Sequence, residues 1–359
     1  MRKFAPSRRT LLKGSAAIGL SSMGLSALAT RVVSAAPAAE AVTPALIKAA
    51  QQEGVVNWYT SADLQVAEKI GKAFTAKYPG VICNVERAGA ERVFTRVAQE
   101  YGANIHRVDA SNTGDAAMFD QWKKQGVLAA YLPEDMAKFI PANYRDADGT
   151  HAIMRSSLCV IAYNTDMVKA ADAPKSFADL LDPKWAGKLV KANPSYSGTI
   201  ITSTYQMVQA LGWPYFEKLA KQKVMQVQSA TDSPKKVVLG ERPVMFDGNE
   251  YNVFIYHESG KPIAPVYAPE GSPIILMPAA IFKAAPHPNA ARLFQSYLFS
   301  GEAQQMFIDV GGLRSVHTQA KEKAGRLPLS QIKILNKYPE HLIEHSEEIK
   351  KRYSAYFGV

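Results

Sequence analysis

The feature that most constrains the fold is a repeated alternation of strand-like and helix-like segments between residues 54 and 131. Short runs rich in β-branched and aromatic residues each lead into a longer run whose apolar residues recur at helical spacing. The strand-like runs are 54–63, 81–89 and 107–115, and the helix-like runs are 64–80, 90–104 and 116–131. This order predicts an α/β fold with a mainly parallel sheet flanked by helices.

The first 38 residues are typical of an export signal. A basic start precedes a run of Gly, Ala, Ser and Leu that is too short and too often broken for a membrane span. The segment SRRTLLK, with Arg8 and Arg9, is typical of a twin-arginine signal, and a general secretory leader is the alternative. Cleavage is predicted after one of three small residues, Ala35, Ala36 or Ala38. We therefore expect a periplasmic protein that meets the twin-arginine export machinery.

The charge of the chain argues against a nucleic-acid partner, and its two cysteines bear on whether it holds a disulfide. Six of the formal +10 charges lie in the first 38 residues, which hold no acidic residue, so the remainder is near +4. No basic stripe is left, and we expect no nucleic-acid partner. The two cysteines, Cys83 and Cys159, lie in apolar strand-like runs. Buried thiols are the favoured interpretation, and a disulfide is the alternative.

Catalytic signatures are missing from the sequence. It contains no GxSxG or HExxH, and none of its seven histidines pairs with a nucleophile in a known pattern. The nucleotide motifs GxGxxG and GxxxxGK[ST] do not occur either. We expect a binding protein without a cofactor, and a secreted enzyme is the remote alternative.

Two extended runs, 154–168 and 262–283, bracket a central block. The roughly 320 residues beyond the leader exceed the ~250–300 at which a single core stops growing. The pattern predicts two lobes joined by two hinge strands. Lobe 1 would comprise 39–154 plus 264–359, and lobe 2 the inserted residues 155–263. A ligand would bind in the cleft between them, and the lobes would close by a hinge motion.

Polar residues end the strand-like runs of the first half. In a parallel sheet, ligands bind beyond the carboxyl ends of the strands, next to helix N-termini that favour anions. The candidates at these ends are Ser61, Asp63, Arg87, Asn112 and Thr113, and Tyr59 is a candidate for an aromatic wall of the site. The alternative for each short polar side chain is a helix cap.

Several stretches resemble a known family. They are VVNWYTSAD, VIAYNTDMV, SFADLLDPKWAGKL, NPSYSGT, ATDSPKKVVLGERPVMFDGNEYN and NAARLFQSYLFSGEAQQMF, and together they span about residues 50–320. The chain is identified as similar to the periplasmic binding proteins of ABC importers, in the ferric-binding-protein-like family. This resemblance implies two α/β lobes, a cleft, and delivery of the ligand to an inner-membrane permease. Members of the family take up ferric iron, phosphorylated sugars, phosphonates, thiamine and other small solutes.

The segment NPSYSGT precedes a helix-like run. Its hydroxyls and glycine favour a nest for phosphate, phosphonate, sulfonate or carboxylate. The candidates are Ser195, Tyr196, Ser197, Gly198 and Thr199, and an N-cap with a glycine turn is the alternative. Arg155 and Arg87 are candidates for bidentate contacts to an oxyanion.

The segment FDGNEYN supplies the last candidates, Asn249, Glu250 and Tyr251. Iron-binding members of the family are expected to carry adjacent tyrosines here and a His or Glu after the first strand, and this chain departs from both patterns. If iron is bound, Asp63, Glu250 and Tyr251 are the expected oxygen ligands. A zwitterion would fit an anion nest together with Asp247 and Glu250, although Asp247 is also typical of a turn.

These observations predict a monomeric solute-binding protein that captures a small anionic or zwitterionic organic solute. A ferric iron-binding protein of an iron(III) importer is the alternative.

Overall fold

The computed structural model describes residues 37–335 and 342–359, all within one compact unit, residues 34–359. Residues 1–36 of the predicted leader, which spans 1–38, lie outside the described residues, so its export route and cleavage stay predictions. No helix in the described part of the chain is long and apolar enough to cross a membrane.

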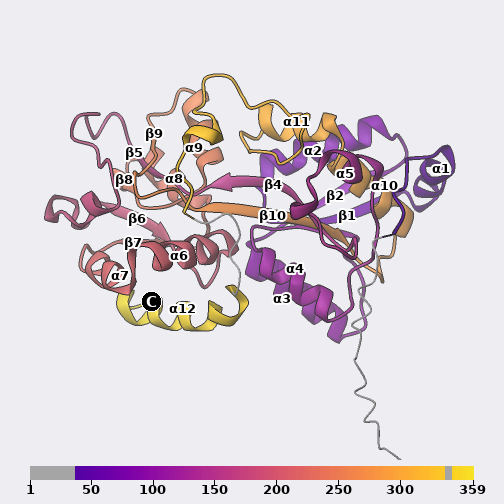
Figure 1. Cartoon of the computed structure of the whole chain (residues 1–359), viewed down its shortest axis with the longest axis horizontal. Coiled ribbons are helices and arrows are strands. Elements are labelled where there is room, and N and C mark those ends of the chain that lie inside the picture. Colours follow the sequence, from indigo (N-terminus) through magenta and orange to yellow (C-terminus); the bar gives the residue numbers. More distant parts are fainter. Residues whose placement is uncertain (1–36, 336–341) are drawn as a thin grey trace, which may run out of the picture. The chain divides into compact units, whose positions relative to one another are not determined.

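The first sheet has the strand order β2-β1-β3-β10-β4. Its strands are β1 (Val55–Thr60), β2 (Ile82–Arg87), β3 (Ala110–Asn112), β4 (Ala152–Leu158) and β10 (Ile274–Ile281). Strand β1 pairs in parallel with β2 and β3, whereas β10 runs antiparallel to both β3 and β4. Figure 1 shows β4 and β10 side by side, running from this sheet toward the second one.

The second sheet has the order β7-β6-β8-β5-β9. Its strands are β5 (Ile161–Tyr163), β6 (Leu189–Ala192), β7 (Met225–Val227), β8 (Val244–Met245) and β9 (Ala264–Val266). Strand β6 pairs in parallel with β7 and β8, and β5 pairs antiparallel with β8 and β9. The predicted α/β class with two lobes is confirmed. We call the parts built on the first and second sheet lobe 1 and lobe 2.

Helices cover both sheets (Figure 1). They are α1 (Pro44–Glu53), α2 (Leu64–Lys77), α3 (Ala90–Gly102), α4 (Ala116–Lys124), α5 (Glu134–Phe139), α6 (Gly198–Leu211), α7 (Trp213–Ala220), α8 (Asp232–Val238), α9 (Glu250–Glu258), α10 (Pro288–Leu298), α11 (Gly301–Asp309) and α12 (Leu342–Phe357). Short 3-10 turns occupy Ala142–Tyr144, Ala178–Leu181, Pro183–Trp185 and Leu329–Gln331. The helix predicted over 116–131 ends early, because the chain turns at Gly126 with φ +71°.

Residue-level signals explain where helices start. Asp63, Asp115 and Ser197 each accept a hydrogen bond from a backbone N–H in the first turn of α2, α4 and α6. This satisfies donors that have no partner inside the helix. The core of lobe 1 centres on Trp58, whose ring packs edge-on against Phe294 at 5.2 Å.

The last helix lies on lobe 2. Helix α12 packs on α6 and α7 (Figure 1), where Tyr353 donates a hydrogen bond to Gln226 at 2.8 Å. From there Lys350 pairs with Glu91 of α3 in lobe 1 at 3.5 Å. The domain boundaries at 154 and 264 stay a prediction, because strand pairing alone does not define where one lobe ends.

Candidate functional site

The strand ends of lobe 1 are joined by hydrogen bonds between their loops. The Ser61 N–H donates to the Asn112 carbonyl at 3.1 Å, and the Gly114 N–H donates to Ser61 Oγ at 3.0 Å. Asn112 is buried and donates through Nδ2 to the Pro278 carbonyl of β10 at 2.6 Å. The polar residues after β1 and β3 therefore form one local cluster.

Arg155 of β4 is the most unusual charge in this cluster. Its side chain is 1 % exposed, and its Nε donates to Asn112 Oδ1 at 2.8 Å. Within the described residues no carboxylate pairs with it, and its Nη1 has no hydrogen-bond partner. Burial lowers the pKa of the guanidinium to about 10. A buried cation without an anion is costly, so this group is suited to receive one.

Tyr251 lies in the first turn of α9, close to Arg155. It is 2 % exposed, and burial raises the pKa of its phenol to about 12 against the opposing effect of Arg155. The backbone of Asp63 hydrogen-bonds to the phenol. The Asp63 carboxylate caps α2 through Oδ1 and accepts from Asn252 Nδ2 at 3.5 Å through Oδ2. Helix α9 of the later chain thereby joins the strand ends of the first half.

Arg87 connects the two lobes. It is the last residue of β2, and its Nε donates to the Ala62 carbonyl at 3.2 Å. Its Nη2 reaches across to the loop between β7 and α8, where it donates to Thr231 Oγ1 at 3.2 Å and Ser229 Oγ at 3.4 Å. The candidate site therefore lies where lobe 1 and lobe 2 are in contact.

The start of α6 approaches lobe 1 closely. A Cβ placed on Gly198 would lie 2.5 Å from Asp115 Cβ and 2.8 Å from Ala90 Cβ. A Cβ on Gly114 would lie 2.5 Å from Thr199 Oγ1. The N-termini of α3, α4 and α6 thus meet, and their first N–H groups have no partner inside the helices. Such convergence favours negative charge.

Two carboxylates near this region are already neutralised. Glu250 is fully buried and pairs with Arg314 and Arg326, each at 2.8 Å, while Tyr267 donates a hydrogen bond to it. Asp247, also buried, pairs with Lys191 at 2.9 Å. Neither carboxylate is left free for a bound cation.

The structure brings most of the predicted residues together. The connected cluster contains Ser61, Asp63, Arg87, Asn112, Arg155, Asn249 and Tyr251. Thr113 is buried and directly follows Asn112 in the chain. Ser197, Gly198 and Thr199 lie at the α6 start that contacts lobe 1. Thr113 Oγ1 and Asn249 Oδ1 are buried atoms without a hydrogen-bond partner in the described structure.

Other predicted residues lie apart from the cluster or are engaged elsewhere. Tyr59 points toward α3, where its hydroxyl donates to Glu100 at 2.8 Å. Ser195 lies in the turn before α6, with its N–H bonded to Asn193 Oδ1, and Tyr196 is 47 % exposed. Glu250 belongs to the arginine network described above.

Sequence reasoning missed Gly114, Asp115, Lys191 and Arg326. The glycine and aspartate were visible as the end of SNTGD, directly after a predicted strand. Lys191 and Arg326 gave no local signal, because their partners lie 56 and 76 positions away in the sequence. Both cysteines are free. The buried-thiol interpretation holds for Cys159, whereas Cys83 is only partly buried, and desolvation raises the pKa of its thiol to about 12.

A two-lobed α/β protein with a polar cluster where its lobes meet is built to hold a small molecule. A family model described as bacterial extracellular solute-binding protein matches residues 55–311, so the chain belongs to this family. It is a solute-binding protein rather than an enzyme, and it serves as the periplasmic solute-binding component of an ABC transporter. The resemblance seen in the sequence is confirmed.

Individual relatives differ in what they bind. The chain is 24% identical to iron uptake protein A2 of Synechocystis sp. over 279 residues, which are 73% of this chain and 78% of that protein. The periplasmic binding protein AfuA from Actinobacillus pleuropneumoniae, with exogenous fructose-6-phosphate bound, matches with TM-score 0.77 and 22% identity. That match covers 85% of this chain and 99% of AfuA.

Iron-bound HitA from Pseudomonas aeruginosa matches with TM-score 0.71 and 20% identity, over 83% of this chain and 99% of HitA. At these identities the structural matches establish the fold alone.

Proposed function

We propose that the protein captures a small organic anion, such as a phosphorylated, phosphonate or carboxylate compound, between its lobes. The observation that carries this proposal is the buried guanidinium of Arg155, which has no carboxylate partner within the described residues. The anion would supply the missing charge and would receive hydrogen bonds from Nη1 and from Thr113. The converging helix N-termini add to the same preference.

Charge balance favours an anion over a zwitterion. An ammonium group would need a free carboxylate, but Asp247 and Glu250 are both held by buried cations. The remaining carboxylate in the cluster, Asp63, is engaged as the cap of α2. With Arg155 and Arg87 against the single carboxylate of Asp63, the cluster therefore has a net positive charge.

Ferric iron is the second candidate, and the iron-related neighbours are what favour it. Its expected ligands were Asp63, Glu250 and Tyr251. Glu250 is occupied by two arginines, and the phenol of Tyr251 lies near Arg155 with a raised pKa. A cation in this position would also face the charge of Arg155. No group of three or more His, Cys, Asp or Glu residues in the described structure is arranged to hold a metal ion.

The transport cycle follows from this assignment. We propose that the lobes close over the solute by a hinge motion between them, and that the loaded protein docks on its permease as a monomer. Closure would be stabilised by the difference in affinity of the two lobe arrangements for the solute. Export by the twin-arginine route would deliver the protein already folded to the periplasm.

Calorimetric titration tests the proposal. Organic phosphates, phosphonates and carboxylates, with ferric citrate for comparison, are titrated into the wild type, Arg155→Met and the control Arg292→Met, whose side chain is 45 % exposed. We expect saturable binding of one anion class and a loss of at least ~100-fold for Arg155→Met, since hydrogen bonds to charged groups contribute about 1.5–3 kcal/mol each. Undiminished anion binding by Arg155→Met, or tight binding of iron alone, would overturn it.

A further inference from the structure

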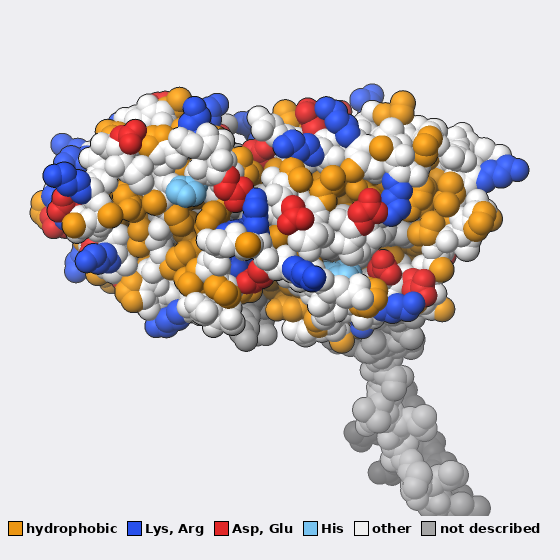
Figure 2. Space-filling model, turned by 90° about the horizontal axis from the view of Figure 1, so that it is seen from above, with side chains coloured by type: hydrophobic (Ala, Val, Ile, Leu, Met, Phe, Trp, Pro, Cys, Tyr) orange, Lys and Arg blue, Asp and Glu red, His pale blue; other side chains and the backbone are white. Residues whose placement is uncertain are grey.

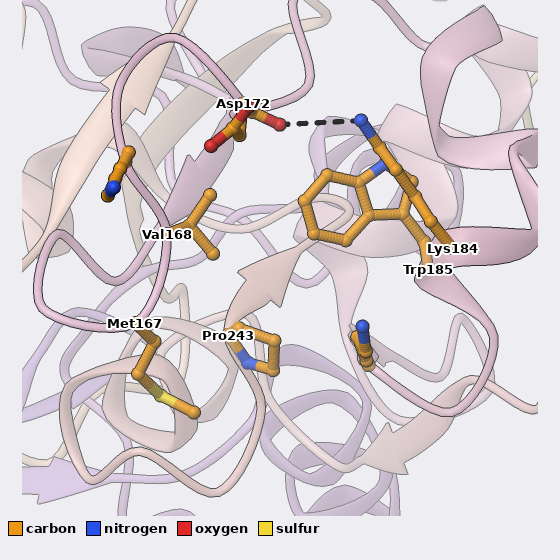
Figure 3. Close-up of a pocket in the computed structure, with 8 residues that line it drawn as sticks. Met167, Val168, Asp172, Lys184, Trp185 and Pro243 are labelled. Atoms are coloured by element: carbon orange, nitrogen blue, oxygen red, sulfur yellow. Dashed lines mark hydrogen bonds between the residues drawn. The ribbon is translucent and has the colours of Figure 1, made fainter.

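A second hollow lies on lobe 2, away from the candidate site. It is a cavity of about 490 Å³ beside the Pro183–Trp185 turn, and Figure 3 shows the residues that line it. Its lining includes Met167, Val168, Lys184, Trp185, Lys188 and Pro243. None of these residues belongs to the cluster around Arg155. Its size falls within the ~300–1,000 Å³ of ordinary small-molecule pockets.

The floor of this cavity is apolar. The indole of Trp185, the isopropyl group of Val168, the ring of Pro243 and the thioether of Met167 surround one space in Figure 3. Trp185 and Val168 are buried at 4 % and 8 % exposure, so they are held by the core of lobe 2. Met167, beside them, is 52 % exposed. The cavity therefore has a floor fixed by the core of lobe 2, beside the exposed side chain of Met167.

The rim of the cavity is positively charged. Lys169, Lys184 and Lys188 line it, and in the described structure none of the three pairs with a carboxylate. Lys184 donates to the backbone carbonyl of Asp172 at 3.5 Å and lies 5.0 Å from the centre of the Trp185 ring. Asp172 is the one acidic residue in the lining. Three cations against one carboxylate leave a field that attracts an anion.

We propose that this cavity is an accessory binding site for a soluble amphipathic anion, a molecule with an alkyl or aromatic body and one anionic head. The body would pack on Trp185, Val168 and Pro243, and the head would face Lys184 and Lys188 at the rim. Burial of the apolar body supplies the affinity, and the positive charge of the lysines selects an anionic head group over a cationic one. The site is independent of the solute bound between the lobes.

A neighbouring hollow provides the matched control. It shares Asp172 and Lys184 with the first but is lined by Asp179 and Asp182, which balance its other lysine, Lys175. A site that needs only surface lysines would depend on Lys175 as much as on Lys188. A site that needs the apolar floor would not.

The test uses three probes with the same eight-carbon body: octanoate, octylammonium and octanol. Binding to the full mature protein is followed by the indole N–H resonance of Trp185 in nitrogen–proton NMR spectra, assigned with Trp185→Phe. We expect octanoate to shift this resonance saturably and at least about 10-fold more tightly than octylammonium. Lys184→Ala with Lys188→Ala should weaken octanoate binding at least about 5-fold, and Lys175→Ala should leave it unchanged.

Two results would overturn the proposal. One is equal affinity for octanoate and octylammonium, or no saturable shift at Trp185. The other is an equal loss of octanoate binding in Lys175→Ala and in the Lys184/Lys188 double variant. Because the lysines are exposed, these variants are expected to fold, and a thermal melt of each confirms it.

Discussion

Gly198→Ala should weaken solute binding without destabilising the protein. The new methyl group would lie 2.5 Å from Asp115 Cβ and 2.8 Å from Ala90 Cβ, whereas carbon atoms pack at about 3.5–4.0 Å. Both neighbouring Cβ atoms are fixed to helix starts and cannot rotate away. The start of α6 must therefore move back from lobe 1 by about 1 Å. Overpacking of this kind costs ~1–3 kcal/mol.

This overpacking destabilises only the arrangement in which the start of α6 contacts lobe 1. If solute binding requires that arrangement, the affinity should drop about 5- to 150-fold. Unfolding of the solute-free protein should not become easier, because alanine is a better helix former than glycine. Gly102→Ala is the control, since a Cβ at Gly102 meets nothing within 4 Å.

Calorimetric titration with the bound solute gives the affinity, and small-angle X-ray scattering gives the lobe arrangement with and without it. We expect Gly198→Ala to need more solute to reach the compact form. If the variant binds with unchanged affinity and compacts as the wild type does, close approach of α6 to lobe 1 is not part of binding.

Three further predictions concern neighbouring residues. Ser197→Ala with Thr199→Ala should lower solute affinity while the thermal melt shows a folded protein, and unchanged affinity would argue against an anion nest at α6. Lys191→Met should cost ~3–5 kcal/mol in guanidinium unfolding, because Asp247 is left buried without its partner, and a loss below about 1 kcal/mol would refute that. Burial raises the pKa of Asp115 to about 7, above its value of ~3.9 in the unfolded chain. The folded state therefore binds more protons between about pH 4 and 7, so stability falls as pH rises through this window. Asp115→Asn, which can still cap α4, should flatten that slope in unfolding curves measured across it.

The parallel part of lobe 1 was predictable because its strands and helices alternate along the sequence. Each strand there is followed directly by the helix that covers it, so periodicity was sufficient. The antiparallel strand β10 inserts between β3 and β4 although it lies more than a hundred residues further along the chain. Periodicity within one segment carries no signal for such pairing.

The same distinction applies to the candidate site. Residues at strand ends, such as Asn112, and Arg155 at the start of an extended run were found from their positions, and the hydrogen bond between them fits that reasoning. The role of Glu250 was not predictable, because Arg314 and Arg326 lie 64 and 76 positions away. In the sequence Glu250 stands next to Tyr251 with no basic residue nearby, whereas in the folded protein it pairs with two arginines.

Native mass spectrometry of mature protein purified from its own periplasm, compared with the same sample after denaturation, identifies the molecule held between the lobes. We expect an excess mass that corresponds to one small organic anion, released unchanged on denaturation. An excess mass of one iron atom would contradict it and would return Asp63 and Tyr251 to consideration as metal ligands.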